Sequence, residues 1–191
     1  MSNIDDTAPI SVRNLVNHKV VYTNAENNRR VVFEPFQVKN VPAGELRALN
    51  FSNGGTTLLH NFLSVQSSEL RKEFNIPADM VEYDWKEQDI INVLTDLSQP
   101  IEALEDALEF GPDGIKEMIV DYAVAMKIPD SNRRRVISRM MGVNIDNMIE
   151  IQEKVAELQQ NNDFQEMEAE NHGRRMNKND TTRTSGRRLK R

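Results

Sequence analysis

The chain has 191 residues, of which 38% are hydrophobic and 28% are charged, and its formal net charge is −6 at pH 7. This length allows one ordinary domain or two small ones, and the modest apolar share predicts that part of the chain lies outside the core. No run approaches the ~20 apolar residues of a membrane span, and the absence of cysteine excludes disulfides, thiol catalysis and thiolate zinc sites. The first residues have neither a basic nor an apolar stretch, so we expect no secretory signal and an intracellular-type setting.

Residues 1–10 are polar and contain Pro9, which predicts a flexible arm. Residues 11–65 follow as a β-rich module, because short bursts of Val, Phe and Tyr alternate with turn residues. An Asn-rich segment at residues 23–28 suits a hairpin, and Pro35 separates two of the bursts. We expect three or four short strands, too few to bury much apolar surface alone.

Residues 56–65 are ambiguous. Leu58, Leu59 and Phe62 have helical spacing, whereas Thr56 and Val65 favour a strand. The interpretation adopted is a strand, because it would complete a small sheet.

Residues 66–83 are predicted to form a linker with a short helix capped by Ser67 or Ser68. A helical domain is predicted over residues 84–160, with its first helix capped by Asp84. Its five helices have apolar stripes and are separated by Gly and Pro residues, which is typical of a compact bundle. The stripe of the fifth helix includes Val155 and Leu158. The fold class is therefore α+β, with a small β-rich module before a five-helix bundle.

Residues 161–191 are predicted to be a polar and then basic tail that is disordered without a partner, because it has few large apolar residues. Eight basic residues and one acid, Asp180, give residues 172–191 a charge of +7, which leaves −13 for residues 1–171. Such an asymmetry is typical of an interaction segment, although a tail that only aids solubility has the same pattern. The candidate partner-binding residues of the tail are Arg174, Arg175, Lys178, Arg183, Arg187, Arg188, Lys190 and Arg191.

A second charged feature is acidic. Residues 82–113 contain ten acids and one base, Lys86, for a net charge of −9. This face either docks a basic surface, which includes the tail of another copy, or prevents self-association by repulsion. The candidate partner-binding residues within it are Glu102, Glu105, Asp106 and Glu109.

No catalytic constellation is evident in the sequence. The three histidines, His18, His60 and His172, lie in unrelated contexts, and no nucleophile motif, metal-ligand spacing or phosphate-binding glycine loop is present. A helix-turn-helix outline at residues 133–144 is opposed by the acids of the helix that would enter the DNA groove. We therefore predict a protein that is not an enzyme and has no cofactor, no metal and no small-molecule substrate.

The order of several short motifs is also informative. They are Phe33-Glu34-Pro35, Gly54-Gly55, the run from Asp106 to Ile115, Asp121-Tyr122-Ala123-Val124, and Gly142-Val143-Asn144. Over about residues 11–150 this pattern resembles small proteins encoded in the structural gene clusters of tailed bacteriophages. The resemblance implies a non-enzymatic virion or virion-assembly protein, located in the virion and, during assembly, in the host cytoplasm. Its partners would be other virion proteins in multiple copies, on the capsid, neck or tail, and the basic tail lies outside the resemblance.

Two functions are therefore expected from the sequence. In the first, the chain docks on a large oligomeric partner through its β module and its charged surfaces. In the second, it binds nucleic acid through residues 174–191, mainly by phosphate contacts that salt would weaken.

Overall fold

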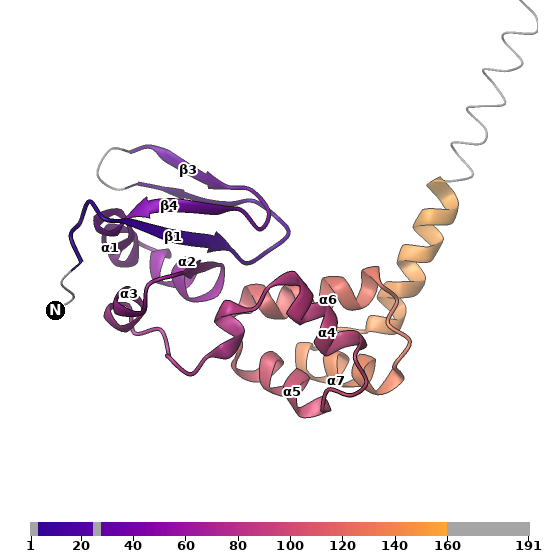
Figure 1. The fold of residues 1–191 in the computed structure, drawn as a ribbon. Helices are drawn as coiled ribbons and strands as arrows, with labels where there is room; N and C mark the ends of the chain where they lie inside the picture. Colours follow the sequence, from indigo (N-terminus) through magenta and orange to yellow (C-terminus); the bar gives the residue numbers. More distant parts are fainter. Residues whose placement is uncertain (1–3, 25–27, 160–191) are drawn as a thin grey trace, which may run out of the picture. The chain divides into compact units, whose positions relative to one another are not determined.

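The computed structural model describes residues 4–24 and 28–159 (Figure 1). By its internal contacts the chain divides into a compact unit, Met1–Asp146, and a second unit that begins at Asn147. Strands dominate the N-terminal part and helices follow, so the α+β class predicted from the sequence is confirmed. None of the described helices combines the length and the apolar character that crossing a membrane requires.

β1 is the central strand of a three-stranded antiparallel sheet, with β4 on one side and β5 on the other. Val12 of β1 lies opposite both Lys39 and Val65, and the alternation along β1 buries Val12 and Asn14. β2 and β3 form a separate hairpin ribbon. The strands are β1 (Pro9–Asn14), β2 (Val20–Thr23), β3 (Arg30–Phe33), β4 (Val38–Pro42) and β5 (Leu63–Val65).

Polar side chains hold the turns of this β part. The buried Asn14 amide donates to the carbonyl oxygens of His18 and Glu34 at 2.8 and 2.9 Å, and its oxygen accepts the Val16 N–H at 3.1 Å. The Tyr22 hydroxyl donates to the Glu45 carboxylate at 2.6 Å, which joins the ribbon to the first helix. Every polar atom of the Asn14 side chain is thereby satisfied, as burial requires.

Residues 55–61 form a helix, so the strand predicted for residues 56–65 is wrong except at Leu63–Val65. The helical spacing of Leu58, Leu59 and Phe62 prevails over the β propensity of the threonines, which lie exposed. Gly54, with φ of +78°, turns the chain before this helix. In Figure 1, α1 and α2 lie against one side of the strands. The helices up to the middle of the chain are α1 (Ala43–Phe51), α2 (Gly55–Asn61), α3 (Ser68–Glu73) and the 3-10 turn η1 (Val81–Asp84).

The segment predicted as a linker, residues 66–83, is folded against the β part. Ser67 caps α3, as predicted, by accepting the Leu70 N–H. Tyr83 is fully buried, and its hydroxyl oxygen lies at hydrogen-bond distance from the carbonyl oxygens of Leu59 (2.7 Å) and Leu63 (2.8 Å), which share its one hydrogen. The same oxygen accepts the Val65 N–H at 3.1 Å. The end of α2, β5 and η1 are therefore held by one side chain.

A charged cluster holds the same junction from outside. Arg71 donates to both carboxylate oxygens of Asp84, at 2.7 and 2.5 Å, and its guanidinium lies 4.7 Å from the centre of the Tyr83 ring. Arg13 of β1 donates to the carbonyl oxygens of Asp84 (3.0 Å) and Trp85 (2.7 Å). Asp84 is thus occupied by an ion pair and does not cap the next helix, which begins at Glu87.

Four short helices, separated by short connections, make up the rest of the first unit. They are α4 (Glu87–Thr95), α5 (Ile101–Phe110), α6 (Asp113–Ala125) and α7 (Ser131–Met141). Their core side chains are the apolar stripes seen in the sequence, which include Ile90, Leu104, Ile115, Ile119 and Ile137.

Arg133 supports the end of α4 rather than a nucleic-acid surface. It is 4% exposed and donates to the carbonyl oxygens of Val93, Asp96 and Gln99 at 2.9–3.0 Å. It also pairs with Asp130 at 2.9 Å. Its neighbour Arg134 pairs with Asp146 at 2.5 Å, so two arginines of the possible helix-turn-helix are used within the fold.

A final helix covers residues 145–159. Val155 and Leu158, expected on an inward-facing stripe, are 46% and 63% exposed. The predicted polar and basic tail, from residue 161 onward, lies outside the described residues.

Candidate functional site

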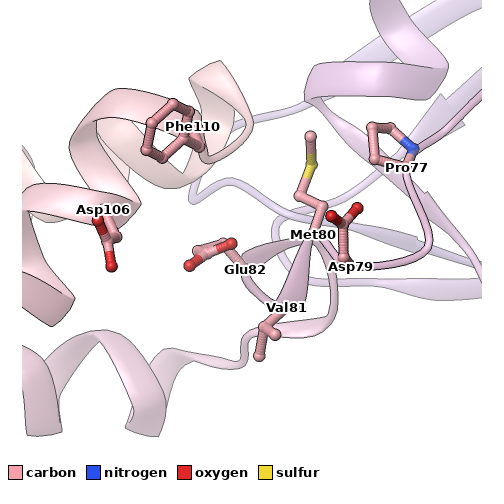
Figure 2. A pocket seen from close by; sticks show the side chains of 7 residues that line it. All are labelled: Pro77, Asp79, Met80, Val81, Glu82, Asp106 and Phe110. Carbon is pink, nitrogen blue, oxygen red and sulfur yellow. The ribbon is translucent and has the colours of Figure 1, made fainter.

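A groove of about 550 Å³ lies between the segment that follows α3 and the helix α5. We call it the acidic groove and define it by the residues shown in Figure 2: Pro77, Asp79, Met80, Val81, Glu82, Asp106 and Phe110. In this view Glu82 points toward α5, which contributes Asp106 and Phe110. Two segments about thirty residues apart thus form one surface.

One wall begins where α3 ends. Asn75 takes the left-handed conformation, with φ of +60°, and the Ile76 N–H returns to the Arg71 carbonyl at 2.9 Å, which closes the helix. Ile76 is buried, so the chain is fixed before it reaches Pro77. Tyr83 fixes it again after Glu82. The residues between these two anchors are therefore held in place, and Pro77, Asp79 and Val81 among them are exposed.

The other wall is the last part of α5. Asp106 and Phe110 are four residues apart and lie on one helix face, because side chains at i and i+4 are neighbours. The opposite face is buried through Leu104, Ala107 and Leu108. A Cβ atom on Gly111 would lie 3.4 Å from the Cβ of Glu82, so the two walls approach closely at the end of α5.

Apolar and acidic groups share this surface. Val81 is 68% exposed and Phe110 is 63% exposed, which is unusual for side chains of this kind when they lie together in a hollow. Asp79, Glu82 and Asp106 supply three carboxylates, and none of the seven lining residues is basic. Carboxylates accept hydrogen bonds and do not donate them, so the groove suits a ligand that is cationic and partly apolar.

Asp84, two residues after the lining residue Glu82, forms an ion pair with Arg71. Arg71 hydrogen-bonds Asp84 and holds the pKa of that carboxyl below its ordinary value, although burial opposes the effect. Asp84 therefore stays ionised at a lower pH than an isolated aspartate does.

The predicted acidic residues are distributed unevenly about this site. Asp106 lines the groove, whereas Glu105 pairs with Arg139 at 2.6 Å on another face of α5. Glu102 and Glu109 are exposed and do not line it. The predicted basic residues of the tail, 174–191, lie outside the described residues.

Sequence reasoning missed most of the lining. Asp79, Met80 and Val81 were assigned to a linker, and Phe110 was taken only as part of a motif. A weak signal existed in Val81, an apolar residue that lies between Asp79 and Glu82 and two residues before the aromatic anchor Tyr83. What the sequence does not contain is the proximity of residues 79–82 to residues 106–110.

His60 makes a contact within the fold. His60 Nε2 lies 2.9 Å from the Phe74 carbonyl oxygen, which joins α2 to the end of α3. Within residues 4–24 and 28–159, no three His, Asp or Glu side chains gather in a way that could hold a metal ion.

Comparison of the chain with protein-family models, with curated proteins and with solved structures gave no match. The candidate site is therefore argued from its own geometry.

Proposed function

We propose that this chain is a non-enzymatic docking protein, whose acidic groove binds a basic and partly apolar segment of a partner protein. The observation that carries the proposal is the groove itself, in which exposed Val81 and Phe110 lie beside three carboxylates. The resemblance of residues 11–150 to phage structural-cluster proteins supplies the setting, which is the assembly or the finished particle of a tailed bacteriophage.

The two kinds of group in the groove have different tasks in this proposal. Full burial of a valine or a phenylalanine stabilises a complex by about 1.5–3 kcal/mol, so Val81 and Phe110 provide most of the affinity. Asp79, Glu82 and Asp106 attract cationic side chains, raise the association rate and reject acidic partners. Binding by such a surface weakens as salt increases, because these carboxylates are exposed to solvent.

The function is tested by particle association. Phage particles and partly assembled intermediates are purified from cells that make the wild-type chain, and the chain is quantified by mass spectrometry. The same is done with a groove variant, Val81→Ser with Phe110→Ser, and with Leu97→Ser. Leu97 is a matched control, because it is a 73% exposed apolar residue outside the groove.

We expect the wild-type and Leu97→Ser chains in the particles or intermediates at equal copy number, and the groove variant to be lost. If the groove variant is present in particles at the wild-type copy number, the groove does not take part in docking. Absence of the wild-type chain from every particle fraction would overturn the phage setting.

A further inference from the structure

We propose that the helix over residues 145–159 pairs with the same helix of a second copy, as a parallel two-stranded coiled coil. This helix lies outside the acidic groove, so the inference is independent of the proposed function. It starts from an apolar row in the second unit, which consists of Met148, Ile151, Val155 and Leu158. We call this row the seam.

The spacing of the seam is that of a coiled coil. Its steps of three, four and three residues place Met148 and Val155 at positions a of a heptad abcdefg, and Ile151 and Leu158 at positions d. Ile151 is 51% exposed, Val155 46% and Leu158 63%, and Met148 is half-buried. An apolar row with this period on an exposed helix is suited to a partner helix of the same kind.

The second heptad of the seam favours two parallel strands, whereas Ile151 at position d of the first heptad does not share this preference. β-branched residues at a with leucine at d favour a parallel dimer, and the second heptad has Val155 at a and Leu158 at d. In such a pair each seam residue meets its own counterpart, so the row is complementary to itself.

Charges next to the seam permit this pairing. The flanking e and g positions are Asn147, Gln152, Lys154 and Gln159. In a parallel pair, Lys154 of one helix faces Gln159 of the other, so no like charges meet across the interface. Three glutamates, Glu150, Glu153 and Glu157, occupy the outer c and f positions, where they keep the other side of the helix in water. The Lys154 ammonium lies 3.9 Å from Glu150, one turn earlier on the same helix.

The length of the seam sets the strength of the association. The next two seam positions, 162 and 165, are Asn and Gln, so the apolar row ends at Leu158 after two heptads. Self-sufficient coiled coils have three to four heptads or more. The pairing is therefore expected to be weak and dependent on concentration, with each copy contributing one helix.

Disulfide trapping tests the proposal directly, because the full chain contains no cysteine. Leu158→Cys places a thiol at a d position, where the two helices of a parallel pair face each other. Glu157→Cys is the matched control, because its thiol lies one residue away on the outer side. Both full-length variants are oxidised at the same concentration, and covalent dimers are quantified on non-reducing gels.

We expect Leu158→Cys to form the covalent dimer at least about tenfold faster than Glu157→Cys, because only facing thiols meet the geometry of a disulfide. Adding Ile151→Asp to Leu158→Cys should remove this advantage, since a charge would then be buried in the seam. Ile151 is exposed in the single chain, so this substitution leaves the fold of that chain intact.

Equal rates for the two single-cysteine variants, or no effect of Ile151→Asp, would overturn the seam as a self-pairing surface. The cysteine-free wild type should show a monomer–dimer equilibrium in analytical ultracentrifugation. If the wild type dimerises in ultracentrifugation but Leu158→Cys forms no covalent dimer, the parallel register is refuted. If the wild type is a monomer at all concentrations, the pairing itself is refuted.

Discussion

Arg133 is a buried arginine of the first unit, so its replacement should lower the free energy of unfolding. Its buried guanidinium donates to carbonyl oxygens in the last turn of α4 and in the loop that follows, and it pairs with Asp130. In Arg133→Met, three carbonyl oxygens and one carboxylate lose their charged partner, so we expect a loss of about 2–4 kcal/mol in the free energy of unfolding.

Urea denaturation of the full-length protein measures this loss, and Arg135→Met is the control. Arg135 lies on the same helix and is exposed, so its substitution should change stability by less than about 0.5 kcal/mol. Equal effects of the two substitutions would contradict the structural role of Arg133.

The stability contributed by the ion pair between Arg71 and Asp84 depends on pH. Arg71 lowers the pKa of Asp84 in the folded protein, so the pair contributes stability above the unfolded value of about 3.9 and loses it as pH falls through the folded value. Near neutral pH, we expect the free energy of unfolding of the wild type to be about 1 kcal/mol higher than that of Asp84→Asn. The difference is small because the carboxylate is half exposed. Thermal melts at several pH values should show this difference shrinking below about pH 4. An unchanged difference at pH 3 and pH 7 would contradict the assignment.

At the scale of elements, the turn between α1 and α2 depends on two glycines for different reasons. A Cβ on Gly55 would lie 1.7 Å from the Leu49 carbonyl oxygen, so Gly55→Ala forces the two helices apart. Gly54 has open space around it, but its φ is +78°. We expect Gly55→Ala to cost about 3 kcal/mol and Gly54→Ala about 1 kcal/mol in thermal unfolding. The reverse order would show that the close packing of α1 against α2 is wrong.

The elements also show what a sequence of this kind can predict. Short β-rich bursts between turn residues predicted most of the strands, although β1 begins at Pro9, within the expected arm. Clean apolar stripes predicted α4–α7. Residues 56–65 were misassigned because helix and strand signals overlap there. Val155 and Leu158 were placed inward because an apolar stripe looks the same whether its partner is within the chain or in another copy.

The candidate site was predicted less well than the fold. Asp106 was identified through the charge of residues 82–113, whereas Val81 and Met80 were hidden in an expected linker. Burial of Tyr83 and the Arg71–Asp84 pair turn that linker into a fixed wall. Such long-range contacts have no local signature in the sequence.

At the scale of the molecule, the β part and the helices α4–α7 belong to one compact unit. Arg13, Tyr83 and the Asn17–Asp121 hydrogen bond of 3.0 Å connect them. We therefore expect one cooperative transition in urea, with Trp85 fluorescence and far-ultraviolet circular dichroism changing together. Trp85 is the single tryptophan and lies at the junction. Separate midpoints for the two signals would indicate that the β part unfolds independently.

The central claim is that the acidic groove recognises a basic and partly apolar segment by its own carboxylates. The most direct measurement is a fluorescence anisotropy titration with a short labelled peptide of alternating Leu and Arg. Three full-length proteins are compared: the wild type, Glu82→Gln with Asp106→Asn, and Glu102→Gln with Glu109→Gln. The last two lose the same number of charges, but only the first pair lies in the groove. We predict binding by the wild type, weakening by about tenfold in the groove variant and near-wild-type affinity in the control. Equal weakening in both variants would show general charge attraction and would contradict a groove-specific function.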